Sequence, residues 1–148
     1  GNAREAMLWM RMMADLEHVS AETVLSGAGL LRLYQVSCAL DDIEPVHKSP
    51  AAITSAAEAG EPVAAAVLEQ FCVFLGRVAG NLVLTVGGRG GVYIVGGVVP
   101  RFVDVFMDSG FKRAFADERL LQRHSGLAGD GRISGADWCW CSVAAGVW

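Results

Sequence analysis

The chain has few charged residues, and this shortage limits what it can bind. Only 19% of its 148 residues are charged, the net charge is −4, and Lys and Arg form no block along the sequence. DNA- and RNA-binding proteins present basic patches to phosphates, so we expect no nucleic-acid partner. Hydrophobic residues make up 53% of the sequence, which is high for a soluble domain. Part of this apolar surface should therefore meet a membrane or another protein surface.

A membrane span is not expected, because polar residues interrupt the one long apolar run. Residues 63–86 are rich in Val, Leu, Ala and Phe but include Glu69 and Arg77. An ionised group at bilayer depth is costly, so the run is better explained as a buried amphipathic helix with no membrane partner. The N-terminal segment carries Glu5 and Asp15 in a helical pattern, which is not typical of a signal peptide.

The chain has only four cysteines, and their positions indicate no disulfide or metal centre. Cys38 and Cys72 lie in apolar helical patterns and are expected to be buried thiols. Cys139 and Cys141 are too close for an unstrained disulfide, and they lack the second pair that a zinc site needs. We therefore expect a reduced, cytoplasmic protein without a bound structural metal.

Several common catalytic and nucleotide-binding motifs are also missing. The chain has no Gly-x-Ser-x-Gly, no His-Glu-x-x-His and no Gly-Lys-Ser/Thr phosphate loop. The spacing after Gly88 and Gly90 places Tyr93 where a dinucleotide-binding fingerprint would need its third glycine. Neither a P-loop nor a Rossmann site is predicted.

The most informative segment that is present runs from Gly87 to Pro100. Its β-branched run, Val92–Val95, predicts a strand, and a glycine pair, Gly96 and Gly97, follows it. Glycine has no Cβ, so its backbone can lie directly against a ligand, and a helix N-terminus offers free N–H groups to anions. The order of strand, glycine pair and helix therefore favours contact with a nucleotide, although a simple turn also fits.

The rest of the sequence is mainly helical in pattern, with Ser20 and Ser49 as expected N-caps. Gly27 should stop the helix that Ser20 begins. One strand cannot form a sheet, so either the C-terminal residues supply partners or the other strands lie outside this sequence. The expected helices cover residues 4–16, 21–25, 30–40, 50–59, 62–83, 100–108 and 111–121.

The C-terminal residues 123–148 differ in composition from residues 1–122, and we expect a boundary there. They are rich in Gly and Trp and show neither a helical nor a strand period. Among the acidic residues, Glu22 falls in the first turn of the helix that Ser20 begins, where the helix dipole favours a carboxylate. From spacing alone, Glu22 can be an ordinary helix-start acid.

Three motifs occur in a fixed order along the chain. They are His18-Val-Ser-Ala-Glu-Thr-Val-Leu-Ser-Gly27, Gly90-Gly-Val-Tyr-Ile-Val-Gly-Gly-Val-Val-Pro-Arg-Phe102 and Ser109-Gly-Phe-Lys-Arg-Ala-Phe115. Together they resemble bacterial ATP-dependent glucokinase, collinearly from about Glu5 to Ala116.

The resemblance implies an α/β, helix-dominated part of the actin-like ATPase, ribonuclease H-like fold with few strands. It implies transfer of the γ-phosphoryl group of ATP, with Mg²⁺, to the 6-hydroxyl of glucose, the entry step of glycolysis. In the family, the glutamate at the position of Glu22 binds the sugar hydroxyls. The glycine pair at Gly96 and Gly97 resembles the adenosine-side motif. Glucose and ATP are thus the expected partners.

Other features of the family do not occur in these 148 residues. The Asp-Gly-Gly phosphate loop, the Asn-Asp pair with its general base and the Glu-x-x-His clamp upstream of His18 are all missing. We therefore expect residues 1–122 to be the C-terminal part of the large domain, with no catalytic residue and no activity alone. Residues 123–148 depart from the family, which suggests an altered reading frame or a cloning artefact.

Two alternatives remain open from the sequence. One is a sugar-sensing regulator of the repressor-related branch, although that branch carries a zinc-binding cysteine and histidine cluster before the sugar-binding glutamate. The other is a helical module that forms a homodimer through its exposed apolar surface.

Overall fold

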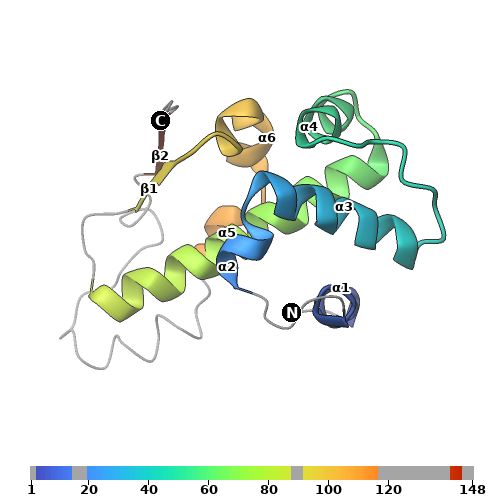
Figure 1. Ribbon diagram of the computed structural model, residues 1–148. Helices are drawn as coiled ribbons and strands as arrows, with labels where there is room; N and C mark the ends of the chain where they lie inside the picture. The colour runs from blue at the N-terminus through green and yellow to red at the C-terminus, as the bar shows by residue number, and fades with distance from the viewer. Residues whose placement is uncertain (1–2, 15–19, 88–91, 117–140, 145–148) are drawn as a thin grey trace. The chain divides into compact units, whose positions relative to one another are not determined.

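The computed structural model describes residues 3–14, 20–87, 92–116 and 141–144. The chain divides into two compact units, residues 1–71 and 72–148, and the boundary falls inside helix α5 (Pro62–Val86). The described residues are mostly helical with two short strands (Figure 1), as the sequence predicts. The division expected near residue 122 lies outside the described residues.

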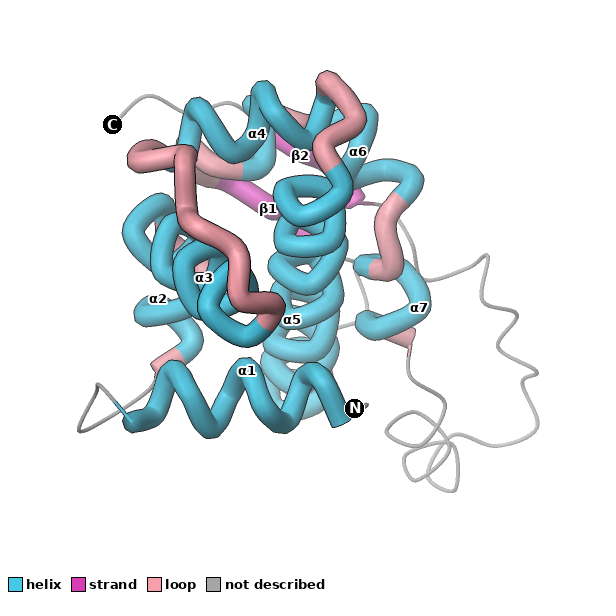
Figure 2. Tube along the Cα trace, turned by 90° about the vertical axis from the view of Figure 1, so that its right-hand side faces the viewer, coloured by secondary structure: helices cyan, strands magenta, loops and turns pink. Residues whose placement is uncertain are grey.

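The first unit is organised around one helix, α3, which contacts several of the other helices (Figure 2). Its core contains large apolar side chains at helical spacing, including Leu30, Leu33 and Tyr34 on α3 itself, all almost fully buried. Cys38 is also fully buried and reduced, as predicted. The helices of this unit, besides the start of α5, are α1 (Ala3–Ala14), α2 (Ala21–Val24), α3 (Gly27–Leu40) and α4 (Pro50–Glu58).

Serine side chains begin three of these helices. The hydroxyls of Ser20, Ser26 and Ser49 each accept a hydrogen bond from the backbone N–H three residues on. The predicted caps Ser20 and Ser49 are confirmed. The role predicted for Gly27 was wrong: α2 already ends at Val24, and Gly27 is the first residue of α3 because Ser26 caps that helix.

Helix α5 contains the apolar run that the sequence analysis assigned to a buried helix. By length and composition α5 could cross a membrane, but half of its most apolar window is buried within the protein. Val67, Leu68 and Phe71 are almost fully buried at helical spacing. This burial supports the predicted buried amphipathic helix.

The second unit contains the rest of α5 and the two strands. Strand β1 (Val92–Val95), predicted from its β-branched run, pairs in parallel with β2 (Cys141–Ala144), and Val92 lies opposite Cys141. The C-terminal residues therefore supply a partner strand, which was one of the two open alternatives. The absence of a strand period from residues 123–148 did not exclude this strand, because a four-residue segment such as Cys141–Ala144 is too short to show a period.

The segment after β1 differs from the single helix predicted over 100–108. A 3₁₀ turn, η1 (Val99–Arg101), precedes α6 (Val103–Asp108), and Phe102 between them has the non-helical angles φ −143° and ψ 45°. The break lets Phe102 bury its ring, which is only 1% exposed. The last predicted helix is α7 (Phe111–Phe115), and residues 117–121 lie outside the described residues.

Helices α5 and α7 approach closely in this unit (Figure 2), because two glycines of α5 face the α7 backbone. A Cβ on Gly76 would lie 2.5 Å from the carbonyl oxygen of Phe111, and one on Gly80 would lie 2.8 Å from that of Phe115. Real Cβ atoms do not come this close to a backbone oxygen. The two glycines, one turn apart, therefore form the surface on which α7 packs.

Candidate functional site

Glu22 lies in the first turn of α2 and is exposed to solvent. A capping box fixes the start of this helix: the Ser20 hydroxyl accepts from the Thr23 N–H, and the Ser20 N–H donates to the Thr23 hydroxyl, both at 3.2 Å. The carboxylate of Glu22 is thus carried on a short, well-defined turn. His18, the first residue of the predicted motif, lies outside the described residues.

The turn that carries Glu22 is held against α3 by a glycine. A Cβ on Gly29 would lie 2.3 Å from the carbonyl oxygen of Val24 and 2.5 Å from that of Thr23. Only hydrogen fits at this position, so the α2 backbone can lie directly on the first turn of α3. Gly29 was not predicted to be a positioning residue. The available signal was a glycine in the first turn of a helix, where glycine is a poor helix former and can mark a close contact.

Gly96 and Gly97 lie immediately after the carboxyl end of strand β1, and both are exposed. Gly96 has φ +143°, a backbone conformation that L-residues with a side chain rarely adopt. A Cβ built on either glycine would have no atom within 4 Å. The pair thus presents bare, open backbone at the end of a parallel strand, where ligands of α/β proteins commonly bind.

An arginine that the sequence analysis did not single out closes this glycine turn. The Nε of Arg101 donates to the Gly97 carbonyl oxygen at 2.9 Å, and the Arg101 side chain is exposed. Spacing alone gives no signal for this contact, because an arginine four residues away can point in any direction. Glu22 belongs to the first unit, whereas Gly96, Gly97 and Arg101 belong to the second.

Other polar groups of the first unit connect its helices. Arg4 of α1 donates to both carboxylate oxygens of Asp41, one at 2.7 Å, and to the Ser37 hydroxyl. The Arg4 guanidinium lowers the pKa of Asp41 below its ordinary value. Arg4 and Ser37 also line a cavity of about 190 Å³ together with Leu8, Leu33, Ala66, Val67, Glu69 and Gln70.

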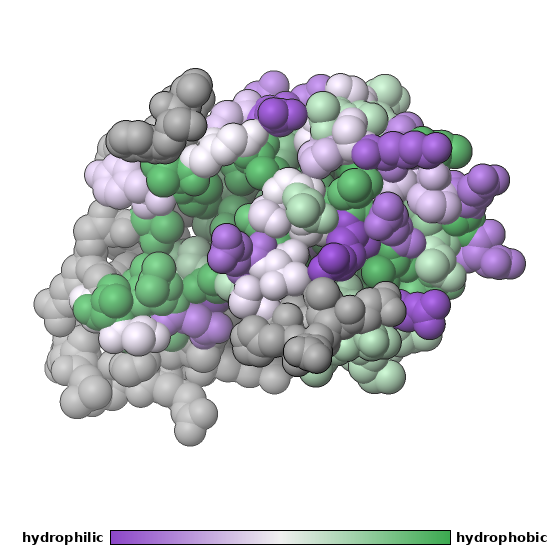
Figure 3. Space-filling model, in the orientation of Figure 1, coloured by the Kyte–Doolittle hydropathy of each residue, from purple (hydrophilic) through white to green (hydrophobic). Residues whose placement is uncertain are grey.

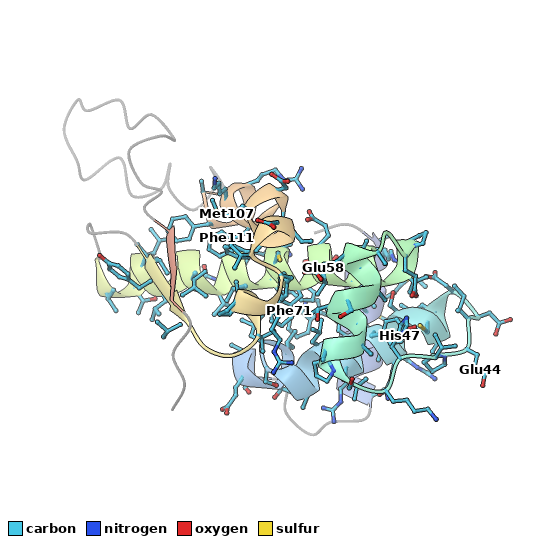
Figure 4. The ribbon with its side chains drawn as sticks, turned by 90° about the horizontal axis from the view of Figure 1, so that it is seen from above. Glu44, His47, Glu58, Phe71, Met107 and Phe111 are labelled. Carbon is cyan, nitrogen blue, oxygen red and sulfur yellow. The ribbon has the colours of Figure 1, made fainter. Side chains whose placement is uncertain are left out.

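A second cluster secures the connection between α3 and α4. His47 pairs with Glu61, and its ring centroid lies 5.4 Å from that of Tyr34. Burial, with a hydrogen bond to Cys38, raises the pKa of Tyr34. Figure 4 shows Glu44 extending outward on the same connection, where its side chain is exposed. Neither cluster includes a residue predicted to bind a ligand.

Within the described ranges, no group of three or more His, Cys, Asp and Glu side chains could hold a metal ion. The sequence itself contains no Asn-Asp pair, so no general base is assigned.

Comparison with known proteins identifies the family. The glucokinase family model matches residues 1–126. The chain belongs to the glucokinase family. A glucokinase of Pseudomonas aeruginosa (strain LESB58) is 55% identical over 113 residues, covering 76% of this chain and 34% of that protein. A glucokinase of Hahella chejuensis is 45% identical over 109 residues, covering 73% of this chain and 34% of that protein.

A solved structure agrees with these relatives. The crystal structure of a glucokinase from an Antarctic psychrotroph matches with a TM-score of 0.76 at 35% identity, over 85% of this chain and 39% of that one. The glucokinase resemblance inferred from the motifs is thus confirmed. The chain spans about a third of the length of the curated glucokinases it matches.

Proposed function

We propose that this chain supplies parts of the glucose and ATP sites of a cytoplasmic glucokinase with the actin-like ATPase fold. In this proposal Glu22 binds the sugar, and Gly96 and Gly97 contact the nucleotide. Membership of the glucokinase family supports the reaction, transfer of a phosphoryl group from ATP to glucose. The observation that supports the residue assignment is that Glu22 and the glycine pair, which match the family motifs, are both exposed. Glu22 lies in the first turn of α2, and the glycines follow β1 directly.

The geometry of Glu22 suits a sugar ligand. Its carboxylate is exposed, and the capping box around Ser20 and Thr23 leaves Glu22 itself out of the local hydrogen bonds. A carboxylate has two oxygens that accept hydrogen bonds from adjacent hydroxyls, and charge-assisted bonds of this kind are strong. A sugar with two neighbouring hydroxyl groups matches this pattern of acceptors.

The glycine pair suits a nucleotide because its backbone is bare. The open space around Gly96 and Gly97 lets a ribose or phosphate approach the main chain directly. Mg²⁺ commonly binds through the phosphates of its nucleotide and few protein groups, so in this proposal it arrives together with ATP. The ion would help to neutralise phosphate charge.

Binding rather than turnover tests the proposal, because this chain carries no assigned general base. The ¹⁵N-labelled 148-residue chain would be titrated with glucose and, separately, with a non-hydrolysable ATP analogue plus Mg²⁺. We expect glucose to shift the amide signals around Glu22, and the analogue to shift those of Gly96 and Gly97. The Glu22→Gln variant keeps the shape but loses the charge, so its response to glucose should weaken while its response to nucleotide remains.

A folded spectrum without shifts at these residues would contradict the assignment. Galactose, a hexose of different hydroxyl geometry, provides the ligand control. Glu44→Gln provides the matched protein control, because Glu44 is equally exposed but lies on the α3–α4 connection.

We further propose that the chain associates as a homodimer through exposed apolar side chains. Met7, Met10 and Met13 of α1 are each more than half exposed. Apolar residues also reach the surface over the C-terminal end of α5 (Figure 3), where Leu82 and Val86 are exposed. Exposed apolar patches often mark interaction sites. Sedimentation that yields a dimer at micromolar concentration supports the proposal, and a monomer at high concentration contradicts it.

A further inference from the structure

Arg101 adds two features to the glycine pair: a side-chain hydrogen bond to its backbone and a positive charge. Its Nε donates to the Gly97 carbonyl at 2.9 Å, which closes the turn between β1 and η1 with a side chain. Arg101 is itself the last residue of η1, and its N–H donates to the Val98 carbonyl oxygen at 3.2 Å. The side chain and the main chain of Arg101 therefore both tie this short turn together.

The rest of the guanidinium is available for a ligand. A guanidinium has five N–H donors, and the contact with Gly97 uses only the one on Nε. Arg101 is exposed, so the two terminal nitrogens can meet an anion in solution. Arginine recognises phosphate especially well because its planar fork offers two parallel donors to two oxygens.

We propose that Arg101 is a further nucleotide-site residue, which positions the Gly97 carbonyl and binds a phosphate group of a nucleoside phosphate. This inference rests on the proposed nucleotide site at Gly96 and Gly97. The phosphate contact of Arg101 would make the site bind a phosphorylated nucleoside more tightly than the same nucleoside without phosphate. The hydrogen bond from the Arg101 Nε to the Gly97 carbonyl, here called the tether, holds the guanidinium beside the bare glycine backbone. The positive charge is therefore already in place before the ligand binds.

Two substitutions separate the tether from the charge. Glutamine has its amide nitrogen the same number of bonds from the main chain as the arginine Nε. Arg101→Gln therefore keeps a donor for the Gly97 carbonyl while it removes the charge. Arg101→Met removes the donor and the charge together. Without any ligand, the amide signals of Gly97 and Val98 should stay near their original positions in Arg101→Gln and move in Arg101→Met.

Phosphate binding is measured by titrating each variant with ADP and with adenosine. We expect Arg101→Gln to bind ADP about tenfold more weakly than the unchanged chain, since a charge-assisted hydrogen bond is lost. Its affinity for adenosine should not change. Arg101→Met should weaken the binding of both ligands, because the glycine turn is also released. Arg113→Gln on α7 is the matched control, since Arg113 is likewise exposed, and it should bind as the unchanged chain does.

The outcomes distinguish this inference from the proposed function. If the unchanged chain responds to ADP at Gly96 and Gly97 but Arg101→Gln binds ADP equally well, only the role of Arg101 is overturned. If the unchanged, folded chain responds to neither ADP nor adenosine, both the nucleotide site and the phosphate contact are overturned. Loss of ADP affinity in Arg101→Gln, with adenosine affinity and the Gly97 signal retained, supports the inference.

Discussion

The Cα of Gly29 faces the carbonyl of Val24 so closely that a Cβ there would lie 2.3 Å from its oxygen. This contact joins the first turn of α3 to the last turn of α2, the helix that carries Glu22. The obstacle is backbone, which cannot rotate away as a flexible side chain can. The position of the proposed sugar-binding carboxylate therefore depends on a glycine seven residues further along the chain.

We expect Gly29→Ala to destabilise the first unit by about 1–3 kcal/mol, the usual cost of overpacking a close contact. It should also weaken the response of the Glu22 region to glucose, because α2 must move away from α3. Urea unfolding and the glucose titration measure the two effects.

Gly27→Ala is the matched control for this substitution. Its new Cβ would lie 3.5 Å from Cγ of Pro50, which is an ordinary contact, and alanine favours a helix more than glycine does. It should leave stability unchanged or slightly raised. An equal loss of stability in Gly29→Ala and Gly27→Ala would contradict the steric explanation.

The ion pair between Arg4 and Asp41 should make stability depend on pH in the acidic range. The Arg4 guanidinium holds the pKa of Asp41 below its ordinary value in the folded chain. The ion pair therefore contributes fully to the free energy of unfolding above the unfolded pKa of Asp41, about 3.9. This contribution is lost as the pH falls through the lower pKa of Asp41 in the folded chain. Asp41→Asn should cost less than about 1 kcal/mol near neutral pH, because both side chains are partly exposed.

Urea unfolding at neutral pH and at low pH checks this prediction, with Asp42→Asn as the control. Asp42 is adjacent and exposed and has φ +55°, a conformation that asparagine also adopts. The difference between Asp41→Asn and the unchanged chain should shrink as the pH falls. A difference that stays constant with pH would rule out the ion pair as its cause.

The glycine surface of α5 gives a prediction in which two physical effects oppose each other. Alanine has a helix propensity about 1 kcal/mol better than that of glycine, so Gly76→Ala would stabilise an isolated helix. The new Cβ, however, would lie 2.5 Å from the carbonyl oxygen of Phe111. We expect the clash to dominate, with a net loss of about 1–3 kcal/mol.

Thermal unfolding of Gly76→Ala, compared with that of Asn81→Ala, measures whether the steric clash outweighs the gain in helix propensity. Asn81 lies on the same helix and is exposed, so its replacement should change stability by no more than about 0.5 kcal/mol. A stabilised Gly76→Ala variant would show that α7 does not rest on this glycine surface.

The sequence predicts local structure well where the determining groups are neighbours. Ser20 and Ser49 act on the amide three residues ahead, and β1 is a local run of β-branched and aromatic residues, so both were predictable. A partner strand from the C-terminal residues was left open, but the position of β2 could not be predicted, because a parallel strand is defined by a partner far away in the sequence. The break at Phe102 was missed because burial of one ring, a tertiary effect, decides it.

The candidate site was predictable only in part, and for a similar reason. The residues Glu22, Gly96 and Gly97 were identified through the family motifs, since spacing alone also allowed an ordinary helix-start acid and a simple turn. The residues that position them, Gly29 and Arg101, act through contacts that need three-dimensional structure to be seen.

The two glycines after β1 should respond differently to alanine, although they are adjacent. Gly96 has φ +143°, so Gly96→Ala strains the backbone and should lower stability by about 1–3 kcal/mol. Gly97 has no such constraint, and its Cβ would meet nothing within 4 Å, so Gly97→Ala should fold with unchanged stability. If a nucleotide lies on this backbone, however, the added methyl group of Gly97→Ala occupies the space that the ligand needs.

We therefore expect Gly97→Ala to lose most of its affinity for ADP while its unfolding midpoint remains that of the unchanged chain. Parallel thermal unfolding and ADP titration of the two alanine variants measure this contrast. A Gly97→Ala chain that is equally stable and binds ADP with full affinity would show that the nucleotide does not contact Gly97. Because stability is held constant, a loss of binding in this variant cannot come from general unfolding and must arise where the methyl group was added.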